Sequence, residues 1–142
     1  EISESADAPE TPGPVLENLA RLRLRGFGLA LDDFGTRHSS LQRLGRTAFT
    51  ELKIDRSLVR DAASHQAGMI ILKAGLRMAR DMKLVAVAEG VETAQDWQLL
   101  QGLGCKLGQG NFIAPPMEAG RVEAWVRAWM ARDCDPVDWP ED

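Results

Sequence analysis

The stretch LALDDFG, residues 29–35, is an apolar run that ends in two adjacent aspartates, Asp32 and Asp33. Apolar side chains alternate with small residues from Phe27 to Leu31, which predicts a β-strand. Neighbouring like charges repel each other, and no fold requires a strand to end in two of them. The aspartate pair therefore calls for a functional explanation, which has to come from the surrounding sequence.

The rest of the chain alternates between helical and strand patterns. We expect helices at residues 15–25, 39–46, 66–82, 94–103 and around 122–129. We expect strands at residues 27–33, 50–55, 84–88 and 105–109, with a partial strand at 1–5. Thr93 and Asp96 have the spacing of a capping box for the helix at 94–103, while Gly26 and Gly104 are helix stops.

Four repeats of strand and helix predict an α/β protein with a parallel sheet, either doubly wound or part of a barrel. Four such units are too few to close an eight-stranded barrel. The chain opens on EISES without an initiator methionine. We therefore expect a fragment of a longer polypeptide, with the remainder of any barrel upstream.

The composition limits the class of protein. A chain of 142 residues with 44% hydrophobic and 27% charged residues is typical of one globular domain. Its net charge of −4 gives no general attraction to nucleic acid or to an anionic membrane. The longest apolar run, residues 84–88, is too short to span a bilayer. Two cysteines without metal-site spacing favour a reducing, cytoplasmic compartment.

Polar side chains gather where the expected strands end, which is where parallel α/β folds carry their chemistry. In chain order these residues are Glu1, Glu4, Asp32, Asp33, Lys53, Asp55, Glu89, Glu92 and Gln109. Converging carboxylates repel unless cations lie between them, and adjacent aspartates can bridge two divalent ions. We therefore predict a two-metal site for phosphoryl transfer, with Asp32 and Asp33 as ligands. Lys53 and Glu89 would position and deprotonate a water molecule.

Each of these groups also has an ordinary structural interpretation. Paired aspartates after a strand commonly cap a helix or a turn. Lys53 with Asp55 could be a surface ion pair of small energetic value, and Gln109 an ordinary strand-end amide. Glu89 and Glu92 could be the acidic first turn of a helix. The agreement of five strand ends favours the functional interpretation over independent caps.

Four motifs in register resemble the EAL domain, a bacterial family of cyclic di-GMP phosphodiesterases. They are DDFGTRHSSL at 32–41, LKID at 52–55, AEGVET at 88–93 and QGNFIAPPM at 109–117. EISES at 1–5 resembles the family's E-x-T-E-S strand, and the match extends to about Trp129. The stretch that should contain the E-A-L signature, about half the domain, is not in this sequence.

The resemblance implies a (β/α)8 TIM-type barrel, of which this chain supplies about the last four βα units. Residues 1–132 would be the C-terminal part of an EAL domain and residues 133–142 an acidic tail. The implied reaction is hydrolysis of cyclic di-GMP to linear pGpG with two Mg²⁺ or Mn²⁺ ions. The metal site is incomplete in this chain, because the upstream glutamate and asparagine ligands are missing.

The resemblance also implies individual roles. The implied metal ligands are Glu1, Asp32 and Asp33. The residues implied to orient and activate the water are Lys53 and Glu89. Asp55 and Gln109 would line the site, and Glu4 and Glu92 would support the loop after the aspartate pair.

Two departures from the family pattern favour a different function. Family members usually read DDFGTGYSSL, so Arg37 here replaces a glycine and His38 a tyrosine. In this family that loop couples the metal site to dimer formation. The alternative is a catalytically inactive EAL-type sensor of cyclic di-GMP or a protein-interaction module. A half barrel would expose a sheet edge and an apolar face, which predicts a homodimer or association with the missing N-terminal half.

Overall fold

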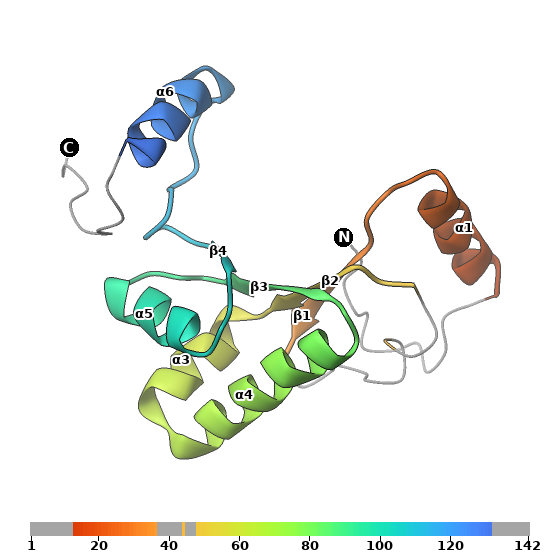
Figure 1. Ribbon diagram of the computed structural model, residues 1–142, viewed down its shortest axis with the longest axis horizontal. Helices are drawn as coiled ribbons and strands as arrows, with labels where there is room; N and C mark the ends of the chain where they lie inside the picture. The colour runs from red at the N-terminus through yellow and green to blue at the C-terminus, as the bar shows by residue number, and fades with distance from the viewer. Residues whose placement is uncertain (1–12, 37–43, 45–47, 132–142) are drawn as a thin grey trace.

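The computed structural model describes residues 13–36, 44 and 48–131. Its centre is a parallel sheet of four strands in the order β1-β2-β3-β4 (Figure 1). The strands are β1 (Ala30–Phe34), β2 (Glu51–Ile54), β3 (Val85–Glu89) and β4 (Leu107–Gln109). The predicted parallel α/β sheet is therefore confirmed, with each of these strands within a few residues of its expected position. The partial strand expected at 1–5 lies outside the described residues.

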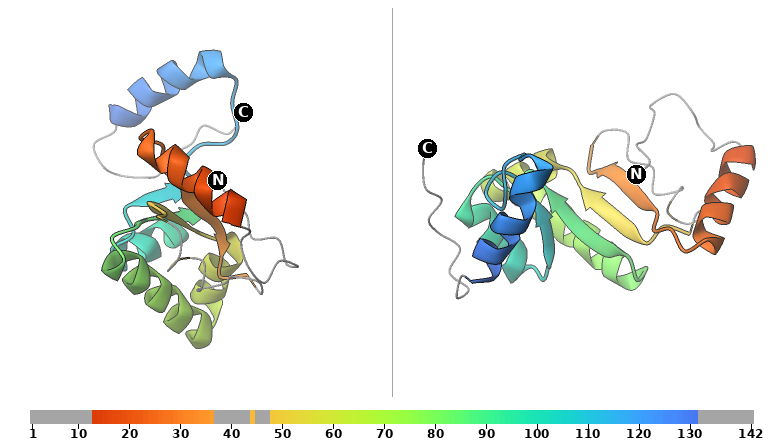
Figure 2. Two further views of the ribbon diagram at one scale, coloured as in Figure 1. Left: turned by 90° about the vertical axis from the view of Figure 1, so that its right-hand side faces the viewer. Right: turned by 90° about the horizontal axis from the view of Figure 1, so that it is seen from above.

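Helices separate the strands in sequence, as the alternation predicts. They are α1 (Gly13–Leu24), α3 (Arg56–Ser64), α4 (Gln66–Asp81), α5 (Ala94–Gly102) and α6 (Ala119–Met130). Helices α3, α4 and α5 lie together on one side of the sheet, whereas α1 and α6 extend from its other side (Figures 1 and 2). The helix expected at 39–46 lies outside the described residues except for Leu44.

Helix α3 is a correction to the sequence-based assignment, which had no helix between β2 and α4. Its N-cap is Asp55, whose carboxylate accepts a hydrogen bond from the Ser57 backbone N–H at 2.9 Å. His65 has extended backbone angles and separates α3 from α4. The two helices pack closely, because a Cβ on Gly68 would lie 2.5 Å from the Asp61 carbonyl oxygen.

The termini of α1 and α5 follow the predicted signals. Thr93 accepts a hydrogen bond from the Asp96 backbone N–H, and the Asp96 carboxylate accepts one from the Thr93 backbone N–H. This capping box satisfies donors that a helix N-terminus otherwise leaves unpaired. Gly26 and Gly104 follow α1 and α5 with φ values of +88° and +81°, a conformation that glycine adopts without strain.

The hydrophobic core lies between the sheet and helices α3, α4 and α5. Leu52 and Ile54 point from β2 towards these helices and are fully buried, as are Leu72 of α4 and Leu100 of α5. The strand register places Leu52 beside Ala86 and Ile54 beside Ala88. Side chains alternate along a strand, so the residues between them face the opposite side of the sheet.

That opposite face is partly open. On the amino-terminal half of the sheet it carries Val85 of β3 and Leu107 of β4, each 48% exposed. Among the described helices none lies flat against it (Figure 2). None of the described helices is long and apolar enough to cross a membrane.

Candidate active site

A cluster of three charged side chains occupies the carboxyl-terminal half of the open sheet face. Lys53 Nζ on β2 lies 2.6 Å from Glu89 Oε1 on β3 and 3.4 Å from Asp32 Oδ1 on β1. The Lys53 side chain is 6% exposed, and the two carboxylates are about one-fifth exposed. The structure therefore brings together three of the predicted site residues from three different strands.

The strand register explains why these three side chains meet. Leu52 and Ile54 fill the core, so Lys53 between them must face the open side. Asp32 follows the buried Leu31, the register partner of Leu52, so it faces the same open side, and the register shift after Leu31 returns Phe34 to the core. Parallel strands place their carboxyl ends at one edge, which brings Asp32 and Glu89 to either side of Lys53.

Lys53 neutralises part of the negative charge of the acidic residues at the strand ends. A lysine that is nearly withdrawn from water keeps its charge at low cost only beside carboxylates. Conversely, Asp32 and Glu89 are held in one small region because the ammonium group lies between them. The cluster formed by Asp32, Lys53 and Glu89 still carries one net negative charge, which attracts cations rather than anions.

Asp33 has an unusual backbone conformation next to this cluster. Its φ of 62° lies in the left-handed region, which non-glycine residues occupy rarely and at some cost. Its backbone N–H donates to Asp32 Oδ1 at 3.1 Å, and its carbonyl oxygen accepts from Thr36 Oγ1 at 3.0 Å. Within the described residues the Asp33 carboxylate accepts no hydrogen bond. The turn thus orients Asp32 and leaves the Asp33 carboxylate available.

Gln109 and Asp55 lie near the cluster but in different settings. Gln109 is the register partner of Glu89 at the end of β4 and is exposed, so it borders the cluster. Asp55 directs one carboxylate oxygen, Oδ1, to the backbone N–H and hydroxyl of Ser57. The ordinary helix-cap interpretation therefore applies to Asp55, and its predicted place in the inner site stays a prediction.

Glu92 points to another partner. Both of its carboxylate oxygens lie 2.7 Å from Arg60 Nη2 on α3, at the surface. The hydrogen bond and the negative charge of Glu92 raise the pKa of the Arg60 guanidinium. Arg60 was not predicted as a partner, because α3 itself was not expected. Glu1, Glu4, Arg37 and His38 lie outside the described residues.

The donor atoms of this cluster suit a hard divalent cation, because such ions prefer carboxylate oxygens. The described part of the chain nevertheless holds no group of three or more histidine, cysteine or acidic side chains placed to bind one ion. Asp32 and Asp33 therefore fit a metal site only as a partial ligand set. Further ligands would have to come from other residues of the same protein or from the substrate.

Comparisons with known proteins agree with this architecture. A parallel sheet with packed helices on one face and charged strand ends on the other is consistent with part of a TIM-type barrel. Residues 1–116 match the EAL domain family, so the chain belongs to that family. The motifs at the ends of β1, β2, β3 and β4 are the ones that suggested this resemblance.

Individual relatives show the same relationship. The chain is 41% identical over 124 residues to cyclic di-GMP phosphodiesterase NbdA of Pseudomonas aeruginosa, covering 87% of this chain and 16% of NbdA. The PaMucR phosphodiesterase, solved as a c-di-GMP complex, superposes with a TM-score of 0.75 at 36% identity, covering 85% of this chain and 49% of that one. BlrP1 of Klebsiella pneumoniae, solved as a manganese/cy-diGMP complex, gives a TM-score of 0.64 at 38% identity over 69% of this chain and 25% of BlrP1.

The chain thus spans about half of the PaMucR chain and 16% of NbdA. The four-stranded sheet corresponds to part of a TIM-type barrel. A partial barrel also accounts for the open sheet face, because that face would line the interior of the closed barrel.

Proposed function

We propose that the EAL domain containing these residues hydrolyses cyclic di-GMP to linear pGpG. The observation that carries this proposal is the placement of Lys53 between Asp32 and Glu89, at the ends of three parallel strands. The names of NbdA and PaMucR support the substrate, since both are phosphodiesterases and PaMucR was solved with c-di-GMP. Because this chain spans only part of these relatives, the activity is proposed for the complete domain.

The reaction needs a water molecule aligned with one phosphodiester. Water oxygen forms the new bond to phosphorus, the bond from phosphorus to the ribose 3′ oxygen breaks, and that oxygen takes up a proton. Glu89 is the proposed general base, because Lys53 is bonded to Oε1 and Oε2 can accept the proton of the water. Lys53 is proposed to orient both that carboxylate and the water, since its ammonium group has three donors in fixed surroundings.

Divalent cations would supply charge neutralisation and polarisation of the phosphate, and the proposed ions are two Mg²⁺ or Mn²⁺. The proposed ligands on this chain are Glu1, Asp32 and Asp33. The left-handed turn at Asp33 supports this assignment, because it keeps both aspartates at the strand end. The manganese and calcium complexes of BlrP1 support the use of a divalent cation.

The remaining assignments are also proposals. Gln109 and Asp55 are proposed to line the substrate site, with Glu4 and Glu92 supporting the adjoining loop. Residues 1–132 are proposed to be the C-terminal part of the EAL domain, with an acidic tail at 133–142. A cytoplasmic location is also proposed, because the chain has two cysteines without metal-site spacing. The open sheet face is proposed to associate with the N-terminal half of the barrel or with a second copy.

The proposal is tested on the complete domain that contains these residues. Purified protein is incubated with Mn²⁺ and cyclic di-GMP, and pGpG is quantified by chromatography. We expect product from the unchanged domain and a loss of at least a hundredfold in Asp32→Asn and in Glu89→Gln. A matched control is Asp81→Asn, an exposed acid on α4 far from the strand ends, which should keep full activity.

The alternative is an EAL domain that binds cyclic di-GMP without cleaving it. The observation that favours it is the replacement of glycine and tyrosine by Arg37 and His38 in the loop after the aspartate pair. Saturable binding of cyclic di-GMP by calorimetry without pGpG would establish the sensor. The double substitution Arg37→Gly with His38→Tyr, which returns this loop to the usual family sequence, would then be expected to produce activity.

A further inference from the structure

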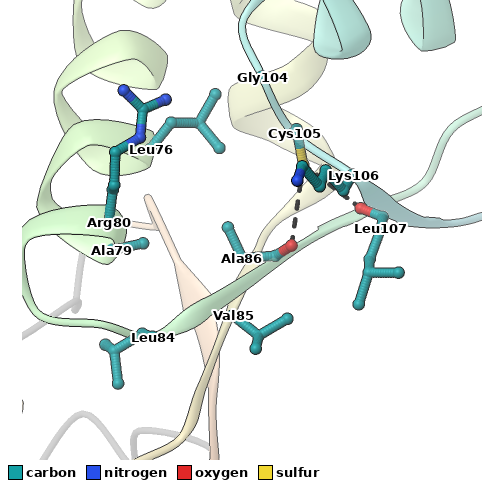
Figure 3. A pocket seen from close by; sticks show the side chains of 10 residues that line it. All are labelled: Leu76, Ala79, Arg80, Leu84, Val85, Ala86, Gly104, Cys105, Lys106 and Leu107. Carbon is teal, nitrogen blue, oxygen red and sulfur yellow. Dashed lines mark hydrogen bonds between the residues drawn. The ribbon is translucent and has the colours of Figure 1, made fainter.

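A cavity lies at the opposite end of the strands from the Lys53 cluster. It has a volume of about 320 Å³. Figure 3 shows it between the end of α4, the start of β3 and the turn that leads into β4. Its lining residues are Leu76, Ala79, Arg80, Leu84, Val85, Ala86, Gly104, Cys105, Lys106 and Leu107. The volume is at the lower end of the range for ligand pockets, so any ligand must be small.

The cavity is lined mainly by apolar side chains, together with two positively charged ones. Leu76 and Ala79 of α4 are buried and form one apolar wall, and Leu84 continues it towards β3. The charged residues of the lining are Arg80 and Lys106, both exposed, and no acid lines the cavity. A purely cationic lining contrasts with the net charge of −4 on the whole chain. The charge therefore selects an anion.

Arg80 is placed for this purpose by the turn opposite it. The position that a Cβ on Gly104 would occupy lies 3.2 Å from Arg80 Nη2, so the guanidinium reaches across from α4 to this turn. Within the described residues neither Arg80 nor Lys106 makes an ion pair. By contrast, Arg77, one turn earlier on α4, has Asp81 as a partner at 3.6 Å. Arg80 and Lys106 thus keep their hydrogen-bond donors for a ligand.

Cys105 lines the cavity, and its thiol is unreactive in this setting. Its thiol donates to the Leu107 carbonyl oxygen at 3.3 Å, and burial raises the pKa of the thiol. A thiol with a raised pKa stays protonated and is a poor nucleophile. The cavity therefore has the properties of a binding site and lacks those of a reactive centre.

We propose that this cavity binds a small amphipathic anion, with its negative head group on Arg80 and Lys106 and its apolar body against Leu76, Ala79 and Leu84. The site is separate from the proposed catalytic cluster. It lies at the start of β3, whereas Glu89 ends that strand about 13 Å away at the usual rise per residue. Its occupancy does not depend on the proposed phosphodiesterase activity.

The test uses octanoate as the anionic probe and octanol as its uncharged counterpart. Each is titrated into the ¹⁵N-labelled 142-residue chain while amide chemical shifts are recorded. We expect saturable shifts with octanoate at residues 79–86 and 104–107, and at least tenfold weaker binding of octanol. The double variant Arg80→Gln with Lys106→Gln should weaken octanoate binding at least tenfold. The matched control is Arg77→Gln, which removes a paired arginine outside the cavity and should leave the affinity unchanged.

Both altered side chains in the double variant are exposed, so the fold is expected to persist and the amide spectrum reports whether it does. Shifts centred on Lys53 and Glu89 at the carboxyl ends of the strands, in place of residues 79–86 and 104–107, would overturn the proposal. Equal affinity for octanol and octanoate would also overturn it, as would an unchanged affinity in the double variant. Absence of saturable binding by the well-folded chain would have the same consequence.

Discussion

At the scale of single residues, the position of Lys53 has the clearest energetic consequence. Its ammonium group is the positive partner of two carboxylates that are themselves mostly withdrawn from solvent. Replacing it by an apolar side chain of similar length leaves Asp32 and Glu89 close together and uncompensated. Removing one partner of a buried ion pair is much more costly than removing one partner at the surface.

We therefore expect Lys53→Met to lower the free energy of unfolding by roughly 3 kcal/mol. Urea denaturation followed by circular dichroism measures this change. The triple variant Lys53→Met, Asp32→Asn, Glu89→Gln removes all three charges and should recover a large part of the loss. A Lys53→Met protein as stable as the unchanged chain would contradict the electrostatic role of this cluster.

Asp33 provides a second prediction, because its backbone conformation is strained. We expect Asp33→Gly to raise the free energy of unfolding by about 0.5–1 kcal/mol, since glycine relieves the left-handed strain. The same variant should abolish pGpG formation by the complete domain if Asp33 is a metal ligand. Lys83 has a similar φ of 59° away from the site and provides a matched control. Lys83→Gly should stabilise the chain comparably and leave activity unchanged.

The site residues differ in how far the sequence can place them. Asp32, Lys53 and Glu89 follow apolar strand patterns, and parallel strands bring their carboxyl ends together, so the sequence predicts their proximity. The settings of Asp55 and Glu92 depend on α3, whose nine residues lie directly against the following helix. The hydrophobic pattern of such a short helix cannot be distinguished from that of the helix that follows it. Only the extended backbone at His65 separates the two helices.

At the scale of the elements, Asp55 allows the cap and the site interpretations to be distinguished. Asparagine caps a helix about as well as aspartate, whereas alanine does not. We expect Asp55→Ala to lower the free energy of unfolding by about 1 kcal/mol and Asp55→Asn to leave it nearly unchanged. If Asp55 also serves the reaction, Asp55→Asn should reduce pGpG formation by the complete domain. Full activity of this variant would assign Asp55 to the helix cap alone.

The packing of α4 against the sheet rests on the small size of Gly75. A Cβ at this position would lie 2.7 Å from Phe34 Cε1, and Phe34 is buried in the core. We expect Gly75→Ala to lower the free energy of unfolding by about 1–2 kcal/mol, because overpacking outweighs the better helix propensity of alanine.

Gly102, in the last turn of α5, is the matched control for this substitution. It has no atom within 4 Å of an added Cβ, so Gly102→Ala should be neutral or stabilising. Thermal unfolding compares the two variants directly. Equal effects at Gly75 and Gly102 would show that Phe34 moves aside without cost.

At the scale of the whole molecule, the sequence predicts the sheet better than it predicts the surfaces. The alternation of strand and helix indicates a parallel sheet because each crossover returns the chain to the same side. The cavity beside Arg80 has no such signature. It arises from the distance between α4 and the turn at Gly104, which no local pattern specifies.

Helix α6 carries apolar side chains that no other described part of the chain covers. None of its residues is buried, and Val122, Val126 and Met130 are 43%, 38% and 80% exposed. Trp125 and Trp129 stack on each other on the same side, with ring centroids 5.3 Å apart. Helical spacing places these five residues on one face. An exposed apolar face of this kind favours association with a partner surface.

We therefore expect the 142-residue chain to self-associate in solution, with α6 contributing to the contact. Sedimentation velocity should show species larger than a monomer at micromolar concentration. The variant Val126→Glu with Met130→Glu places two charges on the apolar face. It should raise the dissociation constant of self-association at least tenfold. Ala124→Glu with Ala128→Glu adds the same charges to the opposite face of the helix and should leave association unchanged. Equal effects of the two pairs would mean that net charge controls association, and a monomer in the unchanged chain would show that the open faces need no partner.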